Sequence, residues 1–224
     1  MIDYYFSLNR FSRSFIQLRS HFALKARKRM FTLFNQVIQP TASFRVLDLG
    51  VTPEQTLPES NLFEHLYPYP QNITAASIED ASFLEELYPG LKFVQTIDNV
   101  LPFGDNEFDV IFCSAVIEHV GDQKSQQAFV AEALRVSKQF FFTTPNRQFP
   151  LDFHTVLPII HWLPQPTHQK ILAKLGYDFW AKTENLNLLS PKNFINLFPS
   201  CQSLTLEKHR LFGLPSNLIL YGTK

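Results

Sequence analysis

Between residues 44 and 145, short apolar runs alternate with segments of helical periodicity, and this alternation limits the possible folds more than any other feature. The runs fall at residues 44–49 (FRVLDL), 73–78, 91–96, 108–114 (FDVIFCS) and 139–143 (QFFFT). Their almost continuous apolar character is typical of strands that are buried on both faces of a parallel sheet. Helices are expected between them at residues 60–67, from Asp80 to the Pro89-Gly90 stop, and at residues 122–136. This alternation of strands and helices predicts a parallel sheet with helices on both faces.

The pattern changes after Thr144. Residues 146–189 are rich in proline, aromatic residues and histidine, which suggests an insertion with a helix near Ile171–Gly176. Ser190 and Pro191 suit the N-cap and first position of a further helix. Residues 203–212 and 217–222 read as two closing strands joined by Gly213–Ser216. We therefore expect an α/β fold: a doubly wound, mostly parallel seven-stranded sheet, with an N-terminal helical cap (residues 1–40), a main domain (41–224) and an insertion after strand five.

The first forty residues are both basic and aromatic. Apolar residues recur at spacings typical of one helix face, and basic residues accompany them: Phe6, Phe11, Phe15, Leu18, Phe22, Met30 and Phe34, with Arg10, Arg13, Arg19, Lys25, Arg27, Lys28 and Arg29. Two interpretations stay open. The helix is a cap over the core, or it makes peripheral contact with an anionic membrane or a partner.

Composition excludes several classes of protein. Hydrophobic residues make up 45% of the chain and charged residues 18%, which argues against disorder. The formal net charge of +0 argues against a nucleic-acid partner. Only two cysteines are present, no apolar run reaches the roughly 18 residues of a membrane span, and the first residues do not resemble a secretion signal. These features predict a cytoplasmic protein without a disulfide framework; they leave its oligomeric state open.

A functional site is expected where the apolar runs end, because ligands of doubly wound sheets bind outside the carboxyl ends of the strands. The residues at these positions carry a resemblance. VLDLG at residues 46–50, followed by LPFGDNEFDVIFCSAVIEHV at residues 101–120, resembles the Rossmann-like S-adenosylmethionine-dependent methyltransferases, in particular the methyltransferase type 11 group.

The resemblance implies S-adenosylmethionine as cofactor and a set of residues around it. Asp48 would orient the methionine amino group, and Gly50 would let the backbone approach the ligand. Glu79 is the preferred partner for the ribose hydroxyls, because Asp80 is also a natural helix cap. Ile97 and Asp98 would border the adenine. The full cofactor-binding set is Asp48, Leu49, Gly50, Val51, Ser77, Ile78, Glu79, Ile97, Asp98, Ser114 and Ala115.

The chain departs from the family in one loop. The family usually continues after VLDLG with Cys-Gly-x-Gly, whereas this chain has Val51-Thr52-Pro53-Glu54. We favour a subfamily loop of different shape. The alternative is a catalytically silent domain that binds a partner or a membrane surface. A nicotinamide-dependent dehydrogenase is a weaker option, because Gly-x-Gly-x-x-Gly is missing.

Catalytic candidates follow strands four and five. Glu118, His119 and His154 are placed to serve a small-molecule acceptor, either as a base or as positioning residues. The insertion would supply an apolar wall and polar groups for this acceptor: Phe149, Phe153, Ile159, Ile160 and Trp162, with Asn146, His154 and His161. A metal site built from His154, His161 and His168 with Glu118 or Asp152 is not expected, because prolines interrupt any helix that would align the histidines. A hydrolase is not expected either, since a Gly-x-Ser-x-Gly elbow is missing.

Overall fold

The computed structural model describes residues 13–97, 100–199 and 201–224, and its central feature is the expected seven-stranded sheet. The strand order is β3-β2-β1-β4-β5-β7-β6. The strands are β1 (Val46–Leu49), β2 (Ile73–Ser77), β3 (Lys92–Gln95), β4 (Phe108–Ser114), β5 (Ser137–Pro145), β6 (Ser203–Leu211) and β7 (Leu214–Thr223). Strands β1 to β5 are parallel, and β7 runs antiparallel to both β5 and β6. This confirms the mostly parallel, doubly wound sheet.

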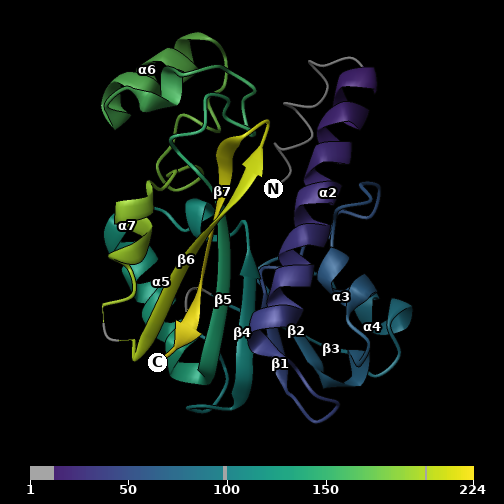
Figure 1. The fold of residues 1–224 in the computed structure, drawn as a ribbon. Helices are drawn as coiled ribbons and strands as arrows, with labels where there is room; N and C mark the ends of the chain where they lie inside the picture. Colours follow the sequence, from purple (N-terminus) through teal and green to yellow (C-terminus); the bar gives the residue numbers. More distant parts are fainter. Residues whose placement is uncertain (1–12, 98–99, 200) are drawn as a thin grey trace.

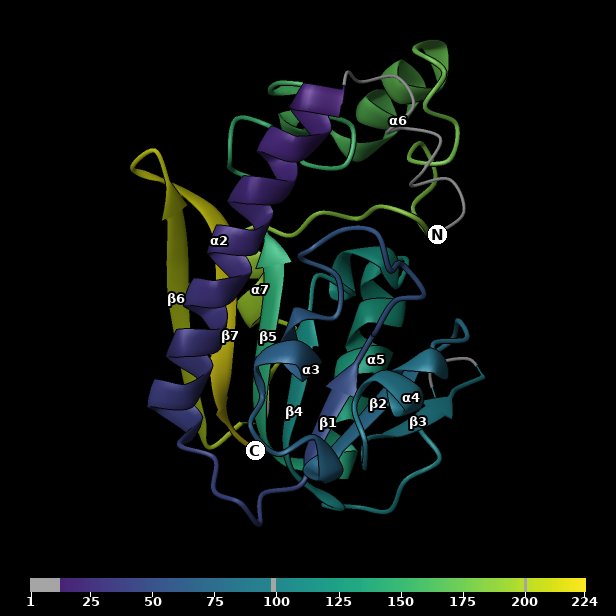
Figure 2. The same cartoon turned by 90° about the vertical axis from the view of Figure 1, so that its right-hand side faces the viewer.

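Helices cover both faces of the sheet (Figures 1 and 2). On one face lie α2 (Arg13–Ile38), α3 (Leu62–Leu66) and α4 (Phe83–Leu87). On the other lie α5 (Gln123–Val136) and α7 (Pro191–Ile195). Short 3₁₀ turns occur at Pro70–Asn72, Ile117–His119 and Ile160–Trp162.

The apolar runs of β4 and β5 supply both faces of the core, because successive strand residues point to opposite sides. Val110 and Phe112 belong to the cluster beneath α2, whereas Ile111 and Cys113 belong to the cluster beneath α5. The fully buried Phe34 of α2 meets Phe112 edge to face at 5.6 Å between ring centroids. The N-terminal helix is therefore anchored in the core by large aromatic contacts.

Helix α2 fulfils the expectation of a helical cap over the described part of the first forty residues. Phe6 and Phe11 lie outside the described residues, and the structure does not describe the side chain of Phe15. None of the helices in the described ranges combines the length and the apolarity that crossing a bilayer requires.

Local capping signals were largely correct. Asp122 accepts a hydrogen bond from the Ser125 backbone at the start of α5, and Ser190 does the same for Asn193 at the start of α7. Asp80 does not cap α4. Its carboxylate accepts from the Ser82 backbone in a turn that precedes the helix.

Two boundaries differ from the sequence predictions. Helix α6 (Gln165–Lys174) begins earlier than expected, because Pro166 occupies its first turn, where a missing N–H is harmless. The β6–β7 hairpin turns at Phe212-Gly213, both with positive φ, and not at Gly213–Ser216. The short turn lets Pro215 join β7 opposite Arg210. The insertion that carries α6 lies beyond the carboxyl end of β5, at the top of Figure 1.

Candidate active site

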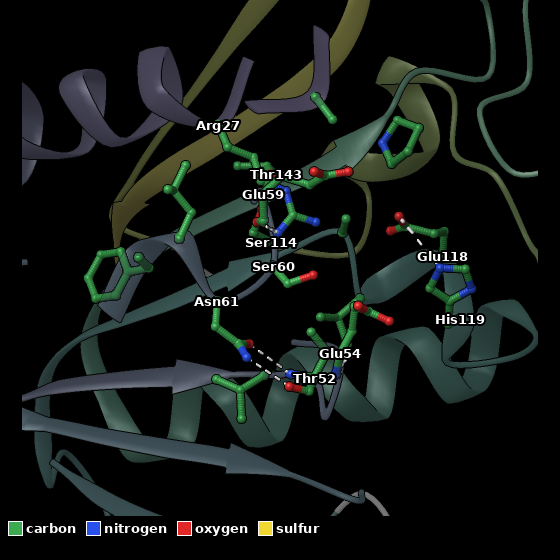
Figure 3. Close-up of a pocket in the computed structure, with 18 of the residues that line it drawn as sticks. Arg27, Thr52, Glu54, Glu59, Ser60, Asn61, Ser114, Glu118, His119 and Thr143 are labelled. Carbon is green, nitrogen blue, oxygen red and sulfur yellow. Dashed lines mark hydrogen bonds and ion pairs between the residues drawn. The ribbon is translucent and has the colours of Figure 1, made fainter. Parts of the chain in front are cut away.

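A cavity of about 610 Å³ opens at the carboxyl ends of β1, β2 and β4 (Figure 3). Most of its lining comes from α2, the loop after β1 with α3, the strand ends with the turn after β4, the insertion, and the β6–β7 hairpin. Leu101, and Phe129 of α5, also line it. A volume of this size is typical of sites for small ligands. The site therefore lies where the strand-end rule predicts it.

Most of the residues expected on the cofactor side line this cavity. They are Asp48, Leu49, Gly50, Val51, Ser77, Ile78, Glu79, Ser114 and Ala115. Ile97 does not line it: its side chain is 83% exposed, and its neighbour Thr96 lines the cavity instead. The strand ends one residue earlier than expected, at Gln95, which shifts the inward-facing position. Asp98 lies outside the described residues.

Gly50 has a packing role that the sequence reading did not foresee. Its φ of +101° is a conformation that residues with a side chain rarely adopt, and a Cβ at this position would lie 2.2 Å from Cγ2 of Val116. The backbone N–H of Gly50 donates to the Ala76 carbonyl at 2.7 Å. Glycine is thus required by contact with Val116, whatever ligand is present, and a valine here would disturb the fold as well as the ligand site.

The loop that replaces the usual glycines is held by side chains. The Asn61 carboxamide bridges the backbone of Thr52, accepting from its N–H at 3.0 Å and donating to its carbonyl at 2.8 Å. Glu54 accepts from the backbone of Thr56 and Leu57. These contacts replace glycine flexibility with a fixed shape that lines the cavity.

Helix α2 is tied to the same loop by two of its side chains. The Arg27 guanidinium donates to the Glu59 carbonyl at 2.8 Å, and the Ser20 hydroxyl donates to the Glu59 carboxylate. Arg27 points from α2 toward the cavity (Figure 3). The N-terminal helix is therefore part of the site as well as a cover for the core.

Two buried carboxyl groups face each other at the end of β1. Asp48 is 6% exposed and Glu64 of α3 is 2% exposed, and both line the cavity. Burial raises the pKa of both groups; the charge of Glu64 raises the pKa of Asp48 further, and the nearby Arg27 charge opposes both shifts. Apart from the Asp48 carboxyl and its own backbone, no group among the described residues donates a hydrogen bond to the Glu64 carboxylate. The pair is therefore suited to a positively charged ligand group.

Glu118 and His119 sit on the 3₁₀ turn that follows β4. Glu118 is fully buried; one of its carboxylate oxygens accepts from the Thr144 hydroxyl at 2.9 Å, while the other has no hydrogen-bond donor among the described residues. Burial raises the pKa of Glu118. The His119 ring donates from Nδ1 to the Asn185 carbonyl at 2.7 Å. Burial, followed by the neighbouring His154, lowers the pKa of His119 to about 3, so its imidazole is neutral.

His154 reaches the same place from the insertion. Its ring centroid lies 4.9 Å from that of His119 and 5.1 Å from that of Trp180. Asp152, which is 2% exposed, accepts from His154 Nδ1 at 3.0 Å and from the Thr155 hydroxyl at 2.6 Å. Hydrogen bonds from His154 and Thr155 outweigh burial and hold the pKa of Asp152 well below its usual range. The structure thus brings all three catalytic candidates together.

The other residues expected around an acceptor are mostly elsewhere. Phe153 and His154 line the cavity, whereas Phe149, Ile159, Ile160, Trp162, Asn146 and His161 do not. Ile159 and Trp162 are about half exposed, and His161 binds the Phe149 carbonyl at 2.8 Å within the insertion. The aromatic wall comes instead from the second half of the insertion, where Phe179 and Trp180 line the cavity with Phe153.

Several site residues had no signal of their own in the sequence. Arg27 and Glu64 belong to helices whose orientation toward the sheet depends on packing. Trp180 lies after α6, in a segment without strand or helix periodicity. The one available clue was the dense aromatic and acidic content of residues 177–185, which core packing would explain equally well.

Comparisons with known proteins agree with this architecture. Residues 59–140 match the family model of the type 11 methyltransferase domain. The chain is similar to the ubiquinone biosynthesis O-methyltransferase of Methylobacterium sp. (strain 4-46), with 30% identity over 139 residues, 58% of this chain and 53% of that one. The chain spans about half the length of this relative, and less of several others with the same name.

Solved structures extend the likeness to almost the whole chain. A methyltransferase from Thermotoga maritima, described as a possible histamine N-methyltransferase, covers 98% of this chain and 99% of its own, with a TM-score of 0.56 and 14% identity. The N-methyltransferase NodS from Bradyrhizobium japonicum WM9, solved with S-adenosyl-L-homocysteine, covers 87% of this chain and 85% of its own, with a TM-score of 0.53 and 11% identity.

The fold and the site together define the class: this is a Rossmann-like methyltransferase fold. Within this fold, residues 59–140 match the model of the type 11 methyltransferase domain. The match includes the block at residues 101–120 that carries the resemblance, whereas VLDLG at residues 46–50 lies before it.

Proposed function

We propose that the protein transfers a methyl group from S-adenosylmethionine to a small-molecule acceptor. The observation that carries this proposal is the acidic cavity at the carboxyl ends of β1, β2 and β4, in a chain whose central segment matches a methyltransferase domain. The altered loop after β1 does not argue against it, because the loop is ordered by its own side chains and lines the cavity.

The residues present fit this cofactor. Two arginines line the cavity against seven carboxylates: Asp48, Glu54, Glu59, Glu64, Glu79, Glu118 and Glu184. Among the described residues, one oxygen of Glu54 is buried without a hydrogen-bond donor, and the Glu64 carboxylate has none beyond the Asp48 carboxyl and its own backbone. S-adenosylmethionine carries an ammonium and a sulfonium, which such groups would stabilise. Asp48 and Glu64 would hold the ammonium, and Arg27 would bind the carboxylate at the same end.

The chain's main contribution to the reaction is alignment, which can supply roughly 7–11 kcal/mol of the barrier. When bound, the cofactor supplies an electrophilic methyl group that bonds to the acceptor while the bonding pair stays on its sulfur. Phe153, Phe179 and Trp180 would exclude water and hold an apolar or aromatic acceptor. The relatives are named O-methyltransferases, which supports a hydroxyl oxygen as the atom that is methylated.

A hydroxyl acceptor must lose its proton, and His154 is the best-placed group to receive it. Its Nδ1 is held by the Asp152 carboxylate, so that Nε2 carries a lone pair. The developing positive charge on the ring would be stabilised by Asp152. Glu118 and His119 flank His154 and would position the acceptor.

Calorimetric titration with S-adenosylmethionine and S-adenosyl-L-homocysteine tests the cofactor half of the proposal. We expect binding at one site per chain, weakened strongly by Asp48→Asn and unchanged by Asp105→Asn, an exposed aspartate far along the chain from β1. A lack of binding at millimolar ligand would favour the alternative of a catalytically silent domain that binds a partner or a membrane surface.

The acceptor half is tested with His154→Gln. We expect turnover to fall by roughly 10²–10⁴-fold with cofactor affinity almost unchanged, because His154 would touch the acceptor and not the nucleoside. His168→Gln is a matched control: His168 is equally buried, at 8% exposure, but does not line the cavity. Unchanged turnover in a folded His154→Gln protein would remove His154 from the active site.

A further inference from the structure

We propose that Glu118, His119 and His154 form a binding site for one divalent transition-metal ion in the wall of the cavity. One donor atom from each of these residues lies within 4.8 Å of the donor atoms of the other two. The sequence did not predict this cluster. No metal site is expected from the sequence: three histidines of the insertion are considered there and set aside, and of these His154 alone reaches the cavity. The binding of the ion itself does not depend on methyl transfer.

Both imidazoles are arranged as metal ligands usually are. His119 Nδ1 donates to a backbone carbonyl and His154 Nδ1 donates to a buried carboxylate. These bonds fix the ring orientation and the tautomer, so that Nε2 of each ring carries the free lone pair. The carboxylate–imidazole contact of Asp152 also makes His154 a stronger ligand.

The carboxylate of Glu118 completes the set. Its Oε2 accepts from Thr144, while Oε1 is fully buried without a hydrogen-bond donor among the described residues. His119 Nε2 lies 3.9 Å from this oxygen, too far for a hydrogen bond. Two nitrogen lone pairs and one carboxylate oxygen therefore converge without a donor among them. A cation bound there would satisfy all three.

The donor set selects the kind of ion. Two imidazole nitrogens and one carboxylate oxygen suit zinc, cobalt or nickel better than magnesium or calcium, which prefer oxygen ligands. Donor–ion distances of about 2.0–2.2 Å would require the three side chains to close in by about 1 Å from their present separations. Three protein ligands leave a position open toward the cavity, as in catalytic metal sites.

The open coordination position would let the ion take part in methyl transfer. This inference rests on the function proposed above. A hydroxyl oxygen of the acceptor bound to the ion would lose its proton more readily, because a bound divalent cation stabilises the negative oxygen. With the ion bound, His154 Nε2 would be occupied, so His154 would be a metal ligand in place of the base proposed above, and the released proton would pass to water.

Metal binding is measured directly on the full chain after dialysis against a chelator. We expect Co²⁺ to bind at one equivalent with the visible absorption of a four- or five-coordinate site, and Zn²⁺ to displace it. His154→Gln and Glu118→Gln should each weaken Co²⁺ binding by more than 100-fold. Asp152→Asn, which keeps all three ligands, should weaken it by about 10–100-fold. His168→Gln should bind as the wild type does, and circular dichroism shows whether each variant is folded.

Two outcomes would overturn the proposal: no stoichiometric Co²⁺ or Zn²⁺ binding by folded wild-type protein, or wild-type affinity in folded His154→Gln. In either case the three acceptor atoms would serve the methyl acceptor directly. Calorimetry of the metal-free protein with S-adenosyl-L-homocysteine separates this failure from that of the proposed function, because cofactor binding uses Asp48 and Glu64 and not this cluster.

Discussion

Gly50 shows how one residue can serve packing and a ligand site together. It joins β1 to the cavity loop with a positive φ and with the Val116 side chain directly against its α-carbon. We predict that Gly50→Ala lowers the free energy of unfolding by about 2–4 kcal/mol, from overpacking and from the unfavourable φ. Urea denaturation measures this loss.

The double variant Gly50→Ala/Val116→Ala is its control. The double variant should regain the stability that Gly50→Ala loses through its clash with Val116. It should not regain the stability lost through the unfavourable φ at residue 50. A Gly50→Ala protein with wild-type stability but without cofactor binding would show instead that contact with the ligand is what requires glycine.

The Asp48–Glu64 pair predicts an unusual dependence of stability on pH. Both folded-state pKa values are raised, so the folded protein holds protons that the unfolded chain has already released. Stability of the ligand-free protein should therefore decrease as pH rises from the ordinary carboxyl range through the raised pKa values. Glu64→Gln should flatten this decrease and stabilise the ligand-free protein near neutral pH, while weakening cofactor binding.

Urea midpoints between pH 4.5 and pH 8 measure this effect. Glu86→Gln, on the exposed side of α4, is the matched control and should keep the wild-type profile. An identical profile for wild type and Glu64→Gln would mean that the two carboxyls do not share a proton-dependent interaction.

The expected residues that the structure places at the cavity are mostly those that follow strands directly. Asp48, Ser77, Ser114 and Glu118 are placed by the end of an apolar run, and the end of a run can be read from the chain. Arg27 and Glu64 could not be predicted, because their direction depends on how α2 and α3 pack against the sheet. Ile97 failed because a one-residue error in a strand end moves a side chain to the other face.

At the scale of elements, α2 is both a cap and a wall of the site. Arg27 lines the cavity and donates to Glu59, whereas Lys28 and Arg29 are exposed. The three basic residues are therefore not equivalent: Arg27 lines the cavity, and Lys28 and Arg29 do not. We predict that Lys28→Ser/Arg29→Ser leaves stability within about 0.5 kcal/mol of wild type, since exposed charges contribute little.

Arg27→Ser should instead weaken cofactor binding and destabilise the loop at Glu59. Thermal melts and calorimetry separate the two variants. Sedimentation with anionic vesicles tests the membrane alternative on the same proteins: about 1 kcal/mol of binding should be lost per exposed charge removed if the helix lies on a membrane. If Arg27→Ser and Lys28→Ser/Arg29→Ser lost the same cofactor affinity, Arg27 would have no special role in the site.

The elements themselves were predicted best where local signals agree. The apolar run of β4 and the Asp122 cap of α5 fixed their boundaries, because burial and capping depend on nearby residues. The insertion was predicted worst. In the insertion, Val156 and Ile159 adopt positive φ. β-Branched residues avoid this conformation unless the surrounding structure imposes it. No local sequence pattern predicts such a conformation.

At the scale of the whole molecule, the cavity joins elements that are distant in the chain. A ligand that binds only the folded state stabilises it by about 2.7 kcal/mol at one hundred times its dissociation constant. For a chain of this size that corresponds to a rise in Tm of roughly 5–11 °C. We predict this shift for S-adenosyl-L-homocysteine, measured by differential scanning calorimetry, and a much smaller shift for Asp48→Asn at the same ligand concentration.

The contact between Phe22 of α2 and Phe212 of the β6–β7 turn joins an early helix to the last hairpin, with ring centroids 5.4 Å apart. A ribosome adds about 5–20 residues per second, so Phe22 would wait roughly ten seconds or longer for this partner to be synthesised. During that interval Phe22 of α2 lacks its contact with the Phe212 ring, and His209 and Leu211 have not yet joined the cavity wall. A nascent chain would therefore retain a ligand only late in translation, after β6 and β7 have left the exit tunnel.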